Sequence, residues 1–93
     1  SSRTASNPST AQLTGGRVTD QPTYASTFPN SGAVIKFTSG NAYDVYAQPY
    51  TPNSKSIASG TMATGATSIT AAGVTFDVSG TPGAGDQFSI GAT

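Results

Sequence analysis

The sequence predicts an all-β domain, a small antiparallel β-sandwich or partly open barrel of five to seven short strands. The clearest observation is the strict alternation over residues 74–79, which places Val74, Phe76 and Val78 on one face of a half-buried strand. Composition agrees, because the chain has no Glu and one Leu, whereas β-branched residues abound. Turn signals also recur at about ten-residue spacing, which is typical of sandwiches and barrels.

The 93 residues make one small domain with a thin core. Val, Leu, Ile and Phe together number 14. So low an apolar content indicates disorder only when the net charge is high, and here four basic residues balance four Asp. We therefore expect a folded domain of modest stability, at the lower end of the ~5–15 kcal/mol typical of domains.

The first part of the chain, residues 1–32, is predicted to be a loosely structured lead-in with one possible short strand. Residues 1–10 are polar and show no alternation, whereas residues 12–19 carry apolar side chains on either side of a Gly-Gly pair and allow that strand. Residues 20–32 contain two prolines and an Asn-Ser-Gly turn signal. We expect them to be mostly loop, anchored by Phe28.

Residues 33–93 are predicted to form the β domain proper. The lead-in and this part together are expected to make a single domain. A hairpin is expected at residues 33–47, with Ile35 and Phe37 on the same face of its first strand and a three-residue, Gly-containing turn. Its second strand alternates in the same way. Two residues of that strand, Tyr43 and Val45, are expected to share a face.

The rest of the chain is predicted to hold two short strands and a second hairpin. After a loop at residues 48–55, a strand is expected over residues 56–62 around Ile57, broken at Gly60, and another over residues 68–70. The final hairpin is expected over residues 74–90. In its second strand Phe88 and Ile90 face inward, and Gln87 and Ser89 face water.

Composition excludes several kinds of site. There is no Cys and no His, so disulfides, thiol nucleophiles, imidazole or thiolate metal sites and His-based triads are impossible. No basic cluster suits nucleic acid, and no apolar run approaches the roughly 20 residues of a membrane-spanning helix. No secretion signal is visible and the chain does not start with Met. We expect a fragment of a larger protein that is monomeric in isolation.

The glycine-rich segment at residues 80–86 has the composition of a phosphate-binding loop. A Walker loop, however, needs Gly-Lys-Ser/Thr opening a helix, whereas here Asp86 follows Gly85 and a strand is predicted next. A carboxylate at this point repels phosphate, and no third glycine completes a dinucleotide fingerprint. We interpret the segment as a structural turn in which Asp86 bonds loop amides.

The four carboxylates, Asp20, Asp44, Asp77 and Asp86, fall in separate predicted elements. A glycosidase needs two carboxylates facing each other across a cleft, and a calcium loop needs clustered oxygens. We expect all four on the solvated surface, with Asp44 near Lys36 across the first hairpin. A hydrolase fragment and a calcium site built from backbone carbonyls stay open as alternatives.

Four tyrosines raise the possibility of an aromatic platform for a sugar. Tyr46 and Tyr50 are expected beside the loop at residues 48–55, where both could be exposed; Tyr24 and Tyr43 are the other two. The alternative is that these rings cap a thin core and keep their hydroxyls in water. The pattern leaves open a carbohydrate- or surface-binding β-sandwich module of a secreted protein or adhesin.

Residues 69–90 carry a motif that resembles one in the bacterial flagellar hook-associated proteins. In that family a Gly and an alternating strand precede Ser-Gly-x-Pro, a small spacer, Gly-Asp-x-Phe and a β-branched residue. The matching positions here are Gly73, Ser79, Gly80, Pro82, Gly85, Asp86, Phe88 and Ile90. The hairpin at residues 33–47 resembles the strand pair that often precedes this motif, so the resemblance spans residues 33–91.

The resemblance implies a structural, noncatalytic domain that projects from a hook-filament junction protein, with the third hook-associated protein preferred over the first. It implies no cofactor and no catalytic or metal-binding residue. The partners it implies are like subunits and neighbouring junction proteins, outside the cell on the flagellum that drives motility. The heptads and long amphipathic helices of such proteins are absent here. The resemblance therefore implies an outer β domain alone.

Overall fold

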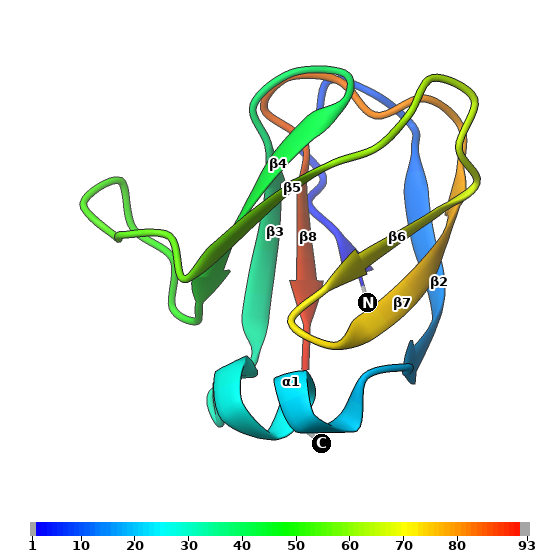
Figure 1. Cartoon of the computed structure of the whole chain (residues 1–93). Coiled ribbons are helices and arrows are strands. Elements are labelled where there is room, and N and C mark those ends of the chain that lie inside the picture. The colour runs from blue at the N-terminus through cyan, green and yellow to red at the C-terminus, as the bar shows by residue number, and fades with distance from the viewer. Residues whose placement is uncertain (1, 92–93) are drawn as a thin grey trace.

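The computed structural model describes residues 2–91 and confirms the all-β fold, with two antiparallel sheets and one short helix below them (Figure 1). One sheet has five strands in the order β1-β8-β3-β4-β5, and the other has three in the order β2-β7-β6. The described residues hold eight strands, one more than the upper limit expected. The elements are β1 (Ser2–Arg3), β2 (Gln12–Val18), α1 (Gln21–Thr27), β3 (Ala33–Phe37), β4 (Ala42–Ala47), β5 (Ala58–Thr61), β6 (Ser68–Ala71), β7 (Val74–Ser79) and β8 (Gln87–Ile90).

The hairpin predicted at residues 33–47 is confirmed as β3 and β4. Ile35 lies opposite Val45, and Phe37 lies opposite Tyr43. All four side chains are buried, so the alternation correctly predicted the inner face of both strands. β8 pairs with the other edge of β3, and β5 pairs with the other edge of β4.

The smaller sheet has β7 at its centre, between β2 and β6. β6 and β7 are joined by a tight turn in which Ala72 and Gly73 both have positive φ, 50° and 82°. Positive φ at both central residues is the geometry of a type I′ hairpin. A strand is predicted at residues 68–70, but the hairpin was not predicted, since a residue other than Gly, here Ala72, is uncommon at positive φ.

The hairpin predicted over residues 74–90 is wrong, because its two strands lie in different sheets. β7 belongs to the three-stranded sheet and β8 to the five-stranded sheet. Residues 80–86 connect the smaller sheet to the larger one. The N–H of Phe37 donates to the carbonyl of Asp86 at 2.8 Å where this segment meets β3. Alternation determines which side chains face the core, but it does not determine which strand is the partner.

The prediction that residues 20–32 are mostly loop is wrong, because Gln21–Thr27 forms helix α1. Asp20 caps this helix, with its Oδ1 accepting a hydrogen bond of 3.2 Å from the N–H of Thr23. Pro22 lies in the first turn, where a missing N–H is harmless. Asp and Pro are signals of loops as well as of helix starts, so they do not distinguish a short helix from a loop.

The amino-terminal lead-in also has defined partners, contrary to the prediction. The possible strand at residues 12–19 is confirmed as β2. Residues 2–10 follow the outer edge of β8, where Ser2 and Arg3 pair with Ser89 and Phe88. The edge of a sheet offers unpaired N–H and C=O groups to any nearby strand. A polar segment can therefore bind there without any periodicity in its own sequence.

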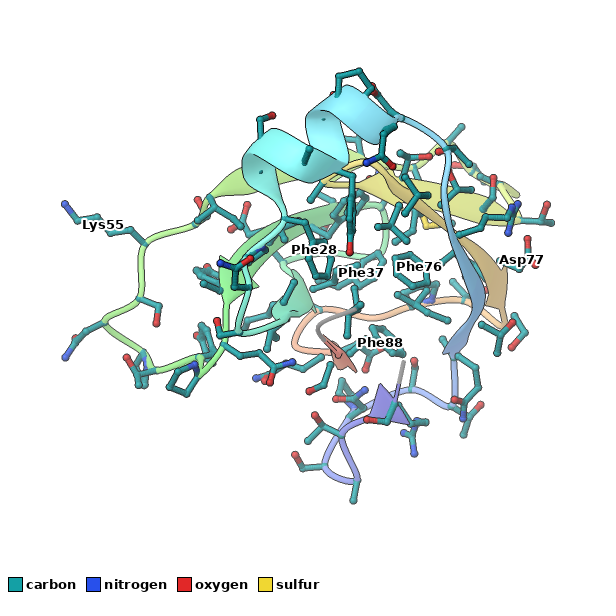
Figure 2. The ribbon with its side chains drawn as sticks, turned by 90° about the horizontal axis from the view of Figure 1, so that it is seen from below. Phe28, Phe37, Lys55, Phe76, Asp77 and Phe88 are labelled. Atoms are coloured by element: carbon teal, nitrogen blue, oxygen red, sulfur yellow. The ribbon has the colours of Figure 1, made fainter. Side chains whose placement is uncertain are left out.

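The core lies between the sheets, and its largest fully buried side chains are those of three phenylalanines (Figure 2). Phe37, Phe76 and Phe88 are at most 1% exposed, so the prediction that Phe76 and Phe88 face the core is confirmed. The two residues reach the core from opposite sheets. Phe28 packs against the core beside Tyr24, with 5.0 Å between ring centroids, and so anchors its segment as expected. Figure 2 shows Lys55 and Asp77 pointing away from this cluster on opposite sides.

The strand predicted over residues 56–62 is shorter than expected and begins after Ile57. β5 spans Ala58–Thr61, so Ile57 precedes the strand instead of lying at its centre. The side chain of Ile57 is 44% exposed. Gly60 does not break the strand. A Cβ at this position would lie 2.5 Å from the hydroxyl oxygen of Tyr43, so the ring of Tyr43 occupies the space of the missing side chain.

Candidate functional site

Asp86 is the most deeply buried polar side chain that the structure describes, with no exposed area. Its Oδ1 accepts a hydrogen bond from the N–H of Ser9 at 3.1 Å. Its Oδ2 accepts one from the hydroxyl of Ser9 and one from the N–H of Gly83 at 2.9 Å. The bond to Gly83 confirms that Asp86 binds a loop amide, whereas the expectation that it lies on the solvated surface is wrong.

The charged state of Asp86 is favoured in the folded protein. Burial alone would raise the pKa of this carboxyl, but the hydrogen bonds from Ser9 and Gly83, together with the positive charge of Arg3, hold the pKa below its usual value. The amide of Gly83, which a phosphate loop would offer to an anion, is thus already bonded within the protein. Residues 80–86 have the geometry of a structural turn.

The other three carboxylates lie in different parts of the fold, and each has its own partner nearby. Asp20 caps α1. Asp77, on β7, pairs with Arg17 at 3.4 Å, and both side chains are more than half exposed. Asp44, on β4, accepts a hydrogen bond of 3.5 Å from the hydroxyl of Tyr46. Within residues 2–91, no group of three acidic side chains could hold a metal ion.

Tyr46 and Tyr50 lie together on the outer face of the five-stranded sheet. Their ring centroids are 4.7 Å apart and their planes cross at 62°, an edge-to-face arrangement. Both side chains are half-buried. The loop that carries Tyr50 is anchored by Gln48, whose Nε2 donates to the carbonyls of Ala33 and Ile90 at 3.0 Å each. The structure therefore brings together the pair that the sequence singled out.

Lys36 completes this aromatic cluster, which comprises Lys36, Tyr46 and Tyr50. Its Nζ donates to the hydroxyl of Tyr50 at 3.1 Å and lies 5.2 Å from the centroid of that ring. The hydrogen bond to Tyr50 raises the pKa of Lys36. Lys36 does lie opposite Asp44 across the hairpin, as predicted, but its ammonium group is turned to Tyr50.

The other two tyrosines lie elsewhere, so the four rings form no common platform. Tyr43 is buried, and its hydroxyl donates to the backbone carbonyl of Thr70 at 3.0 Å. The idea that the tyrosines keep their hydroxyls in water is therefore wrong for Tyr43. Tyr24 is in α1, where its ring packs against Phe28.

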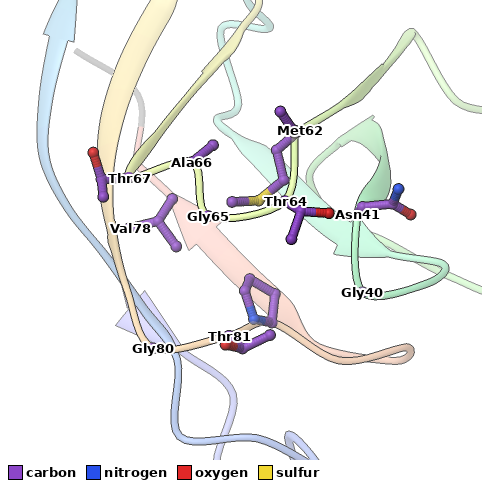
Figure 3. A pocket seen from close by; sticks show the side chains of 12 residues that line it. Gly40, Asn41, Met62, Thr64, Gly65, Ala66, Thr67, Val78, Gly80 and Thr81 are labelled. Atoms are coloured by element: carbon purple, nitrogen blue, oxygen red, sulfur yellow. The ribbon is translucent and has the colours of Figure 1, made fainter.

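A hollow of about 510 Å³ lies where the turn after β3, the β5–β6 connection and the start of the β7–β8 connection meet (Figure 3). Met62, Ala66, Val78 and Pro82 supply its apolar surface, and the other lining residues are Gly, Ala, Thr and Asn. No lining residue is charged, so the hollow offers neither a general base nor a metal ligand of the carboxylate kind. No pattern in the sequence indicates this hollow, because its walls come from three separate turns.

Arg3, Asn7 and Ser9 are functional candidates that sequence reasoning missed. Asn7 bonds to Gln87 and Ser9 bonds to Asp86, which fastens the amino-terminal segment, whereas Arg3 donates to the carbonyl of Ser9 within that segment. Polar residues without periodicity give no signal of such contacts. The signal available in the sequence was their buried partner, Asp86 in the Gly-Asp-x-Phe motif.

In the described part of the chain, no helix has the length and apolar character needed to cross a membrane.

The structure is similar to two crystal structures of Xanthomonas campestris FlgL, in space groups H3 and C2. Each has a TM-score of 0.69 and 29% sequence identity to this chain. The match covers 97% of this chain but only 27% and 26% of the two FlgL chains. No protein-family model and no curated protein matches the sequence. The similarity to FlgL supports the flagellar hook-associated family indicated by residues 69–90.

Proposed function

We propose that this chain is a structural, noncatalytic domain of a flagellar hook-filament junction protein. The observation that carries the proposal is the similarity to FlgL over 97% of the chain at 29% identity. FlgL is the third hook-associated protein, the member of the family that the sequence favoured over the first. The two most specific residues of the motif serve the fold: Asp86 fastens two segments and Phe88 fills the core.

The pairing of β1 with β8 suits a domain that projects from a larger body. Ser2 in β1 lies opposite Ser89 in β8, so the first and last described strands are adjacent and antiparallel. Ends that lie close together allow a domain to be inserted into another without disturbing it. Because the match spans 27% of FlgL, the larger body would be the remainder of such a protein.

The chemistry of the surface supports a role without catalysis. The hollow has no charged lining, and each carboxylate is engaged in a cap, a fastening or a surface contact. In this proposal the domain lies outside the cell on the flagellum. Its neighbours are like subunits and other junction proteins, and the isolated domain is monomeric.

Antibodies raised against the isolated chain test this proposal on intact flagella of cells that produce it. The proposal predicts gold label in one narrow zone between hook and filament. A parallel preparation with antibody absorbed on the purified chain should show none. Label along the whole filament or over the cell body would contradict the junction role.

The aromatic cluster favours a second candidate, a carbohydrate-binding module. Tyr46 and Tyr50 present adjoining rings on the outer face of a sheet, with the donor Lys36 and the acceptor Asp44 nearby. Glycan-array binding that is lost in Tyr46→Ala and Tyr50→Ala, but kept in the loop variant Lys55→Ala, would support this role. An array on which the wild-type chain binds no glycan would remove it.

A further inference from the structure

We propose that residues 2–9 form a strap that the carboxylate of Asp86 fastens, and that loss of this one negative charge frees the strap while the two-sheet core stays folded. The strap is a conformational device of the domain itself. The proposal therefore stands or falls independently of the junction role.

The strap contributes no side chain to the hydrophobic core. None of its residues is buried. Beyond the two-residue pairing of β1 with β8, the N–H of Thr4 donates to the carbonyl of Gln87 at 3.1 Å. Asn7 binds the same residue twice, with its Nδ2 donating to the carbonyl at 2.8 Å and its Oδ1 accepting from the N–H at 2.9 Å. Hydrogen bonds thus tie the strap to the edge of β8.

The far end of the strap is fastened at Ser9. Both its N–H and its hydroxyl donate to the buried carboxylate of Asp86, and its carbonyl accepts from Nη2 of Arg3 at 2.5 Å. With the N–H of Gly83, three donors converge on the two oxygens of Asp86. Such a site suits a carboxylate, because a protonated carboxyl brings a further hydrogen to a place already filled by donors. Among the described residues, Arg3 is the charged group that acts on Asp86.

The main chain around Asp86 is held without the carboxylate. Its carbonyl accepts from the N–H of Phe37 at 2.8 Å, and its N–H donates to the carbonyl of Gly83 at 3.0 Å. β8 also pairs with β3 over four residues, from Ala33 opposite Ile90 to Lys36 opposite Gln87. Removing the charge therefore acts on the strap rather than on the sheet. A freed strap leaves the outer edge of β8 open to another extended strand.

Hydrogen exchange followed by NMR at neutral pH tests the proposal on the wild type, Asp86→Asn and the exposed control Asp77→Asn. In Asp86→Asn, exchange at the amides of Thr4 and Gln87, which bond across the strap, should rise at least about tenfold, the effect of losing a charged hydrogen bond. Exchange in the interior strand β4 should not change, and Asp77→Asn should alter neither region. Unchanged exchange at Thr4 and Gln87, or an equal rise in β4, would overturn the proposal.

A pH titration of the wild type gives a second test that needs no variant. The amide shift of Gly83 reports protonation of the carboxyl of Asp86, to which it donates. Exchange at Thr4, corrected for the intrinsic effect of pH, should rise in the same interval, below the usual Asp value of ~3.9. A shift of Gly83 that titrates while Thr4 stays protected would show that the charge does not fasten the strap.

Discussion

The hydroxyl of Tyr43 donates a hydrogen bond of 3.0 Å to the backbone carbonyl of Thr70 and so links the two sheets. Tyr43 belongs to β4 of the larger sheet, and Thr70 belongs to β6, an edge strand of the smaller one. The ring reaches this position by passing beneath Gly60 in β5. One tyrosine thus fills the core and satisfies an acceptor on a strand edge.

Gly60→Ala should destabilise the domain by about 1–3 kcal/mol, the usual effect of overpacking a well-filled site. The added Cβ would lie 2.5–2.8 Å from three atoms at the hydroxyl end of Tyr43 and would displace the ring. Gly83→Ala is the matched control, because its nearest neighbour would be 4.0 Å away. Thermal unfolding that is equally affected in both variants would disprove the proposed contact.

Tyr43→Phe should lower the free energy of unfolding by about 0.5–1.5 kcal/mol, through loss of one hydrogen bond. The variant should also change the response to alkali. Burial raises the pKa of Tyr43, so its contribution to stability is complete below the unfolded value of ~10 and is lost as pH rises through the folded value. Urea unfolding on either side of that range should show a smaller alkaline loss in the variant than in the wild type. Equal losses would mean that this hydroxyl is not buried.

Phe88→Ala should destabilise the domain by roughly 3–5 kcal/mol, the range for emptying a buried aromatic site. The side chain has no exposed area and meets Phe37 edge-on, with 6.0 Å between ring centroids. Gln87→Ala should change stability little, because the hydrogen bonds of Gln87 to Asn7 are made by its main chain. Similar melting temperatures for the two variants would overturn the assigned facing of β8.

Asp20→Ala should lower stability by about 0.5–2 kcal/mol, as expected for a lost helix N-cap. The carboxylate accepts from both the N–H and the hydroxyl of Thr23, at 3.2 and 2.8 Å. Asp20→Asn should retain most of the stability, because Asn also caps helices well. Chemical denaturation that ranks the two variants equally would rule out the cap as the source of the effect.

Local patterns in the sequence were sufficient for the class of fold and for the facing of most strands. The side chains of Ile35, Phe37, Phe76 and Phe88 are buried as their alternation indicates. The β3–β4 hairpin was also predictable, because a short Gly-containing turn joins two alternating runs. These features depend on residues that are close in sequence.

Strand partners and the fastening of the amino terminus depend on residues far apart in sequence. β8 pairs with β3 and β1 rather than with β7, and Asp86 binds Ser9 across 77 positions. Neither relation leaves a periodic signal. The aromatic cluster was predictable in part for the same reason. Tyr46 and Tyr50 are close in sequence, so their proximity could be predicted, whereas Lys36 reaches them from the neighbouring strand.

An electron cryo-microscopy reconstruction of the hook-filament junction, from cells that produce this chain, tests its structural role most directly. The account predicts domain-sized density outside the tube wall that fits the two sheets, with Ser2 and Ser89 turned toward the wall. A junction without such density, or a fit that turns these paired ends away from the wall, would contradict it.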